Sequence, residues 1–171
     1  RNGLTTTSTR TGAATTSVTF PDGTVTSITR APDPRFGMAS PYVAEHVVTL
    51  LSGLTKTVNR TRAVTLAGPG ALFELETRTE VTTLNGRSWS TTYDKSTSEV
   101  TTISPEGRVA TRVLDALGRT IEVHAPGSLP VSIGYDLDGR PIVTAQGTRQ
   151  IVTSYGPDGM IASITDPLSR T

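Results

Sequence analysis

The chain has 171 residues, no cysteine, few aromatic residues and almost no net charge. Without cysteine it can form neither a disulfide-stapled scaffold nor a thiolate metal site. Lys and Arg number 16 against 15 Asp and Glu, which leaves a net charge of +1. A nucleic-acid-binding domain typically carries a strongly basic face. We therefore expect no nucleic-acid partner.

Long apolar segments are also missing. The longest, residues 43–51, is interrupted by Glu45 and His46, and it is too short to span a bilayer. The first residues lack the apolar core of a signal peptide and an initiator methionine. We expect a piece of a longer protein that does not itself insert into a membrane.

Signals of catalysis are weak throughout. The two histidines, His46 and His124, lie far apart in the sequence, and no metal- or phosphate-binding motif is present. Three glutamates, Glu74, Glu76 and Glu80, alternate along one strand face with Arg78 among them, which is typical of a solvated face. The sequence thus predicts no catalytic residue, no cofactor and no metal, and we expect a protein that is not an enzyme.

Threonine and regularly spaced turn glycines are abundant. Threonine is β-branched and tolerates water, so it suits strands that are wet on one or both faces. The turn glycines are separated by 21, 11, 21 and 20 residues: Gly86, Gly107, Gly118, Gly139 and Gly159. A period of about 20 with a half-step near 10 indicates a meander of hairpins. We predict an all-β fold, an antiparallel β-hairpin meander forming a curved, twisted sheet.

The repeats are not equally clear along the chain. We predict one repeat region over residues 1–171, with clear repeats at 1–30 and 85–171 and an irregular or inserted segment at 31–84. Prolines in 31–41 remove hydrogen-bond donors, so this stretch is expected to interrupt the strand ladder as a loop. Residues 43–51 favour a strand over a short helix, and Gly68-Pro69-Gly70 marks a second irregular connection.

The most informative segment is Tyr135-Asp136-Leu137-Asp138-Gly139-Arg140. Its D-x-x-G-R skeleton recurs from Asp115 to Arg119, with Gly118 in the glycine position. Residues 155–159 keep Tyr155 and the turn pair Asp158-Gly159, and residues 166–170 repeat the skeleton with Ser169 in place of glycine. Such self-similarity at a fixed period predicts a stacked array of one supersecondary unit.

This pattern resembles the YD-repeat, or Rhs-repeat, family of large proteins. The resemblance implies a long β-sheet that spirals into a hollow shell. In bacterial Rhs proteins and toxin complexes the shell encloses a C-terminal toxin polypeptide, and in teneurin-like animal proteins a similar barrel serves adhesion. It implies a non-enzymatic segment of a secreted or cell-surface bacterial protein, whose partners are the rest of the shell and such a polypeptide.

Each residue of the motif has an expected structural task. Asp136 is expected to accept backbone N–H bonds from the turn, and Gly139 to adopt a positive φ. Arg140 is expected to pair with a carboxylate on the adjacent hairpin, and Tyr135 to pack its ring against the neighbouring unit.

A second interpretation is an extracellular adhesion or carbohydrate-binding module. Trp89 is the sole tryptophan and lies close to Tyr93. An exposed pair of this kind could stack on a sugar ring, whereas the alternative is packing between hairpins.

Overall fold

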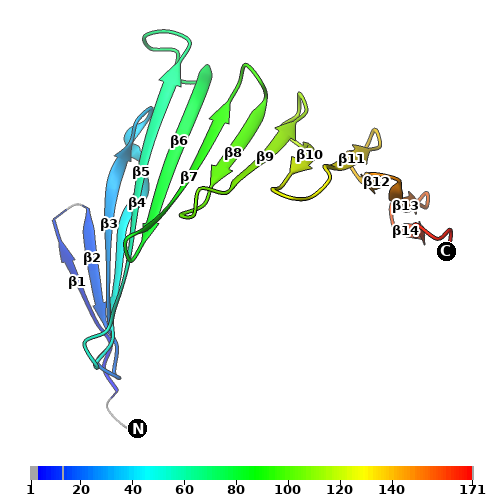
Figure 1. Ribbon diagram of the computed structural model, residues 1–171. Coiled ribbons are helices and arrows are strands. Elements are labelled where there is room, and N and C mark those ends of the chain that lie inside the picture. Colours follow the sequence, from blue (N-terminus) through cyan, green and yellow to red (C-terminus); the bar gives the residue numbers. More distant parts are fainter. Residues whose placement is uncertain (1–3, 13, 171) are drawn as a thin grey trace. The chain divides into compact units, whose positions relative to one another are not determined.

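The protein is all-β. The computed structural model describes residues 4–12 and 14–170, and this part of the chain contains no helix and hence none able to cross a membrane. Fourteen strands follow one another in chain order in one open sheet (Figure 1). The strands are β1 (Thr7–Thr11), β2 (Thr15–Thr19), β3 (Val25–Asp33), β4 (Gly37–Thr49), β5 (Thr55–Leu66), β6 (Leu75–Leu84), β7 (Arg87–Asp94), β8 (Glu99–Ile103), β9 (Val109–Leu114), β10 (Thr120–His124), β11 (Val131–Tyr135), β12 (Pro141–Gln146), β13 (Arg149–Tyr155) and β14 (Ile161–Thr165). The predicted fold class, an all-β meander, is confirmed.

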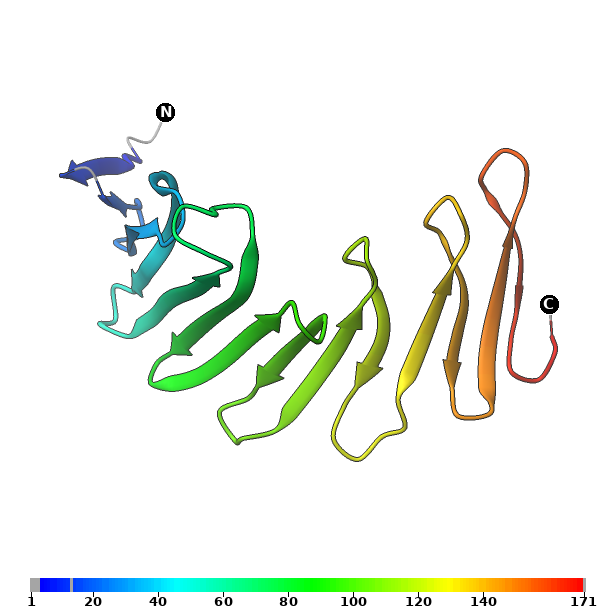
Figure 2. The same cartoon turned by 90° about the horizontal axis from the view of Figure 1, so that it is seen from above.

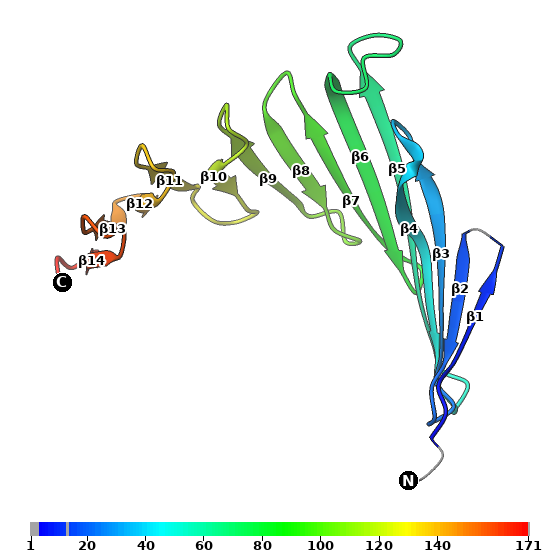
Figure 3. The same cartoon turned by 180° about the vertical axis from the view of Figure 1, so that it is seen from behind.

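Two compact units divide the chain. The first comprises Arg1–Thr92 with Ser104–Glu106, and the second comprises Tyr93–Ile103 with Gly107–Thr171. Strands β1 to β6 and most of β7 belong to the first unit (Figure 3), whereas β8 to β14 belong to the second, where hairpin follows hairpin (Figure 2).

One face of the first unit, the hydroxyl face, consists of the odd-numbered residues in the regular pairs of β1 to β6. Because paired residues share a face, the register places threonine beside threonine, as in Thr7↔Thr19 and Thr49↔Thr55. Every position on it is serine or threonine except Val25, Glu45, Val47, Asn59, Ala63 and Val81. The expectation of threonine-rich strands is confirmed here.

The opposite side, the cationic face, consists of the even-numbered residues of the same pairs. Its charged members are Arg10, Lys56, Arg60, Arg62, Arg78 and Glu80, and its aliphatic members are Val18, Ile28, Val48, Val58, Val64 and Leu84. From Val58 to Val64 the two faces of β5 differ in exposure: Val58, Arg60, Arg62 and Val64 are partly covered, whereas Asn59, Thr61 and Ala63 are exposed. Nearer the start of the strand Lys56 is exposed and Thr57 is partly covered.

No conventional core lies beneath this sheet. Among the described residues no hydrophobic side chain is fully buried, and the one buried polar residue is Asp33, which is 4% exposed. An isolated sheet normally needs a second layer to bury one face. Here pairing across strands and contacts between neighbouring turns must supply much of the stability.

Turns of one kind recur in both units. In each, the N–H of the first residue donates to the carbonyl of the fifth, and the N–H of the fourth donates to the carbonyl of the first. This five-residue turn occurs at residues 20–24, 50–54, 115–119, 136–140, 156–160 and 166–170. The fourth residue has a positive φ, which favours glycine, and Ser169 takes this role at φ 62°.

The β6–β7 hairpin uses a shorter turn. Asn85 and Gly86 have φ values of 46° and 86°, as a two-residue type I′ turn requires. Beside this turn the hydroxyls of Thr83 and Ser88 lie 2.7 Å apart.

The prediction that residues 31–41 interrupt the ladder is wrong. Strand β3 continues to Asp33 and β4 starts at Gly37, with Ala31 opposite Tyr42 and Asp33 opposite Gly37. Pro32 falls where the register shifts, between two paired residues, so its missing N–H costs no ladder bond. Irregular pairing therefore accommodates the proline without ending the strand.

Two other predictions for this part of the chain are confirmed. Residues 43–49 lie within β4 rather than a helix. The Gly68-Pro69-Gly70 segment lies in an irregular connection between β5 and β6, which is closed by a bond from the Ala67 N–H to the Glu74 carbonyl.

Candidate functional site

The repeated motif forms a charged clasp, defined by the aspartate and arginine of one five-residue turn and the tyrosine of the next hairpin. In the turn between β11 and β12, the Asp136 carboxylate binds Arg140 twice. Its Oδ1 accepts the backbone N–H of Arg140 at 2.8 Å, and its Oδ2 accepts the side-chain Nε–H at 2.8 Å. Gly139, at φ 82°, makes the turn tight enough for both bonds. The predicted roles of Asp136 and Gly139 are confirmed.

Arg140 then reaches the next hairpin. Its guanidinium carbon lies 4.6 Å from the centre of the Tyr155 ring, at the end of β13. The Tyr155 hydroxyl donates to the carbonyl of Pro141, the residue after Arg140, at 3.0 Å. A cation over a phenol ring and a hydrogen bond back to the same strand together fasten one hairpin to its neighbour.

The preceding repeat has the same arrangement. Asp115 Oδ1 accepts the backbone N–H of Arg119 at 2.9 Å, and its Oδ2 accepts Nε–H at 2.7 Å. The Arg119 guanidinium lies 4.5 Å from the centre of the Tyr135 ring, and the Tyr135 hydroxyl donates to the Thr120 carbonyl at 2.8 Å. The expectation that Tyr135 packs against a neighbouring unit is confirmed.

The expected partner of Arg140 was wrong. Instead of a carboxylate on the adjacent hairpin, Arg140 binds Asp136 and Asp138 of its own turn. Its contact with the next hairpin is the ring of Tyr155. The motif spacing explains this, because Asp and Arg four residues apart meet across the tight turn.

Partial motifs keep only part of the clasp. In residues 156–160 glycine and methionine replace aspartate and arginine, yet both backbone bonds of the turn remain. Asp158 caps this turn by accepting the N–H of Met160 at 3.0 Å, and Gly159 has φ 78°. Asp166 and Arg170 form the intra-turn bonds, with Nε–Oδ2 at 2.6 Å. The backbone turn therefore forms even where the aspartate–arginine pair of the clasp is missing.

The carboxylates of the clasps are held in their charged form. The backbone N–H of Arg119, and then its side chain, lower the pKa of Asp115. Arg140 lowers the pKa of Asp136 in the same way, and the side chain of Arg170 is the main cause of the lowered pKa of Asp166.

We expect the clasps to weaken in acid. A carboxyl group whose folded pKa lies below its unfolded value stabilises the fold above the unfolded pKa and loses this contribution as pH falls through the folded pKa. The melting temperature should be steady near neutrality and fall below about pH 4. Thermal unfolding followed by circular dichroism across this range checks it. A melting temperature unchanged down to about pH 2 would contradict the assignment.

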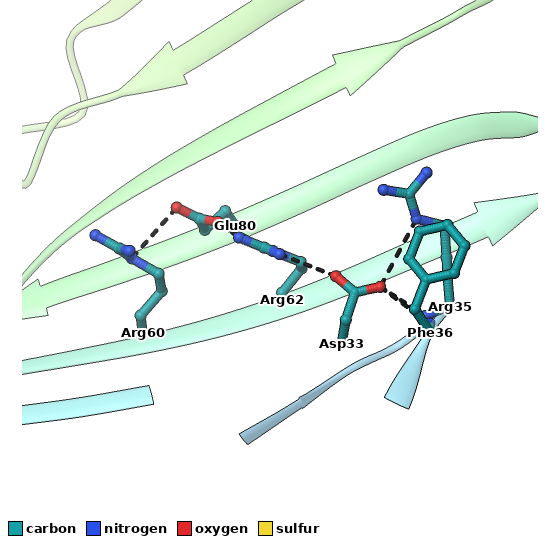
Figure 4. Close-up of polar contacts among 6 residues, drawn as sticks. All are labelled: Asp33, Arg35, Phe36, Arg60, Arg62 and Glu80. Carbon is teal, nitrogen blue, oxygen red and sulfur yellow. Dashed lines mark hydrogen bonds and ion pairs between the residues drawn. The ribbon is translucent and has the colours of Figure 1, made fainter. Parts of the chain in front are cut away.

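A second charged cluster, which the sequence did not predict, lies in the first unit (Figure 4). Charges of alternating sign form a row from Arg60 through Glu80, Arg62 and Asp33 to Arg35. Arg62 donates to Asp33 Oδ2 at 2.9 Å and to Glu80 Oε2 at 2.8 Å. These residues come from β3, β5, β6 and the β3–β4 turn.

Asp33 is the centre of this cluster. Its Oδ1 also accepts the backbone N–H groups of Arg35, at 2.9 Å, and Phe36, at 3.3 Å. Burial alone would raise the pKa of Asp33, but the bonds from Arg35, Arg62 and Phe36 lower it on balance.

Aromatic rings surround the cluster. The guanidinium of Arg62 lies 4.8 Å from the Tyr42 ring centre, so an aspartate–arginine–tyrosine combination occurs here as well. Phe36 packs on Phe73 of the β5–β6 connection with ring centres 5.8 Å apart. A signal in the sequence was the alternation of Arg60 and Arg62, but only the register reveals that Glu80 lies opposite.

The remaining candidate residues do not gather into a site. Trp89 and Tyr93 both lie on β7 and are partly exposed, but they belong to different units. His46 lies on β4 of the first unit and His124 on β10 of the second. Among the described residues, no group of three or more His, Asp or Glu side chains is arranged to hold a metal ion.

Comparison with known proteins adds no family assignment, because no protein-family model and no curated protein matches the chain. The resemblance to YD repeats stays a prediction that depends on the motif residues themselves.

Proposed function

We propose that this chain is a structural segment of a wall built from YD-type hairpin repeats, which encloses or presents a polypeptide. The observation that carries this proposal is the repetition of one clasp. Arg119 on Tyr135 and Arg140 on Tyr155 use the same contacts at nearly the same spacing. A device that joins each hairpin to the next suits an extended wall, since it can be repeated without limit.

The charged groups of the clasps support a structural role. Asp115 and Asp136 each bind an arginine of their own turn, and both arginines lie over a tyrosine. A nucleophile or general base needs an accessible, suitably poised group. In this proposal the mechanism is steric, and the wall separates its polypeptide from the surroundings.

By the same resemblance, we propose a secreted or cell-surface bacterial protein. Its partners would be the rest of the repeat wall and a C-terminal toxin polypeptide. The reading frame on both sides of residues 1–171 tests this. Further D-x-x-G-R repeats that continue over a long stretch and end in an unrelated domain are expected. A frame with few further repeats could not enclose a polypeptide, and would overturn the proposal.

We expect the clasp to couple neighbouring hairpins. Changing Tyr155 to Phe removes the hydrogen bond to the Pro141 carbonyl and should lower the free energy of unfolding by about 1 kcal/mol. Changing Tyr155 to Leu removes the ring as well and should cost more. In an Arg140→Gln background the additional loss from Leu should shrink, because the cation over the ring is already absent.

Chemical denaturation of the single and double variants measures this coupling. A matched control is the partly exposed Thr153, which lies on the same strand outside the clasp and is changed to Val. If the Tyr155 and Arg140 effects were strictly additive, the ring and the guanidinium would not act together, and the clasp would not join the hairpins.

A further inference from the structure

The two faces of the first unit carry different numbers of charged side chains. The hydroxyl face carries one charged residue, Glu45, in its regular pairs. The cationic face carries five cations and, within those pairs, a single carboxylate, Glu80. Even if Asp33 and the neighbouring Glu76 are counted, cations remain in excess.

Aliphatic side chains accompany these cations. Val58 pairs with Leu84, and Val48 lies beside Lys56 in the register. None of these apolar residues is fully buried. Leaving aliphatic surface in water is unfavourable by roughly 25 cal/mol per Å². The hydroxyl face carries fewer aliphatic residues, which are Val25, Val47, Ala63 and Val81, and its many serines and threonines are readily hydrated, so it needs less cover.

Arg60 on the cationic face is partly exposed beside its ion pair. Arg60 is 38% exposed in its side chain, and its Nε lies 3.3 Å from Glu80 Oε1. That Nε is buried and makes no hydrogen bond, so the contact with Glu80 is an ion pair only, and a further carboxylate has to reach the terminal nitrogens of the guanidinium. The planar guanidinium is well suited to bind a further carboxylate through two parallel bonds.

We propose that the cationic face of the first unit binds a polypeptide segment whose carboxylates are interspersed with aliphatic side chains. Charge complementarity selects the acidic partner, and the aliphatic residues between the cations favour a polypeptide over a nucleic-acid backbone. The inference rests on the proposed function of a wall around a polypeptide. It adds that the cationic face is the one that contacts this polypeptide. The hydroxyl face then faces water.

Three fluorescent probes test this with the full chain: a peptide of alternating Glu and Leu, one of alternating Glu and Ser, and a single-stranded oligonucleotide of equal charge. Fluorescence anisotropy should show saturable binding of the Glu–Leu peptide and weaker binding of the other two. Trp89 provides a second signal. Ser88 lies against Thr83 of the hydroxyl face, so the next residue projects to the cationic side, and its emission should shift on binding.

Matched double variants locate the binding face. Lys56→Thr with Arg78→Thr removes two positive charges from the cationic face. Thr55→Glu with Thr77→Glu changes the total charge equally, but on the opposite face of the same strands. The first pair should weaken binding of the Glu–Leu peptide about tenfold, and the second should leave it nearly unchanged.

Several results would overturn the inference. They are no saturable binding, an equal loss in both double variants, equal binding of the Glu–Ser peptide, or an oligonucleotide that binds as tightly as the Glu–Leu peptide. The last would indicate a nucleic-acid surface. None of these results bears on the proposal of a repeat wall, which is tested by whether the reading frame continues in repeats. The proposal of a binding face and the proposal of a repeat wall can therefore fail separately.

Discussion

Replacing Arg62 with methionine is expected to lower the free energy of unfolding by about 2–3 kcal/mol. Methionine retains much of the side-chain packing but removes the cation that binds both Asp33 and Glu80. Asp33 is nearly inaccessible to solvent, so its carboxylate would lose the guanidinium that binds its Oδ2 without gaining water. Urea denaturation of the wild type and the variant measures the loss.

The expected loss lies at the lower end for a broken buried ion pair. Among the described residues no hydrophobic side chain is fully buried, so the Asp33 carboxylate is covered by polar and partly exposed groups and not by an apolar core. Asp33 also keeps its bonds from the backbone of Arg35 and Phe36. Both circumstances limit the penalty.

A double variant isolates the charge effect. Asp33→Asn alone removes the buried charge while keeping most of its shape, and adding it to Arg62→Met should recover part of the stability. Arg60→Met is the matched control, because Arg60 is more exposed and contacts only the edge of the cluster at Glu80; it should cost less than about 1 kcal/mol. Equal losses for Arg62→Met and Arg60→Met would contradict the central place of Asp33.

The second large effect is expected for Gly139→Val, which should cost about 1–3 kcal/mol. Gly139 has φ 82°, a conformation that a β-branched residue accommodates poorly. A side chain here would also come within 3.4 Å of the Arg119 guanidinium. The substitution therefore strains a turn and crowds the clasp of the preceding repeat.

Two controls separate these causes. Gly139→Asn should be milder, because asparagine adopts positive φ more readily, as Asn85 does at φ 46°. Thr144→Val changes an exposed position in β12 and should leave the melting temperature nearly unchanged. If Gly139→Val shifted the melting temperature no more than Thr144→Val, the turn would not depend on this glycine.

Local features of the fold were predictable because they are encoded within a few residues. Glycine spacing located the turns, and the Tyr-Asp-x-x-Gly-Arg pattern identified Asp136 as an acceptor of backbone N–H groups in its turn and Gly139 as a residue with positive φ. The spacing of Asp136 and Arg140 puts both in one turn, but the sequence led us to expect a partner for Arg140 on the adjacent hairpin, and the structure shows the contact within the turn instead. Strand alternation likewise predicted an all-β meander.

Contacts between distant segments were not predictable in the same way. Arg62 meets Glu80 only because β5 and β6 pair in one particular register, and it meets Asp33 only because β3 runs through its prolines. A shift of one residue would reverse the faces of a strand. The prolines of residues 31–41 gave a misleading signal. A proline lacks the N–H group that a regular ladder needs, but Pro32 lies at a register shift, where no ladder bond is required from it.

The amino-acid sequence was enough to predict the strands and the recurring turns, because each depends on neighbouring residues and backbone conformation. Only the folded sheet shows that Arg140 binds the aspartates of its own turn, which ring it covers, and how Asp33 becomes buried although no described hydrophobic side chain is. It also sorted threonine onto one face and arginine onto the other, because the face of each residue is fixed by cross-strand register, which no single strand specifies.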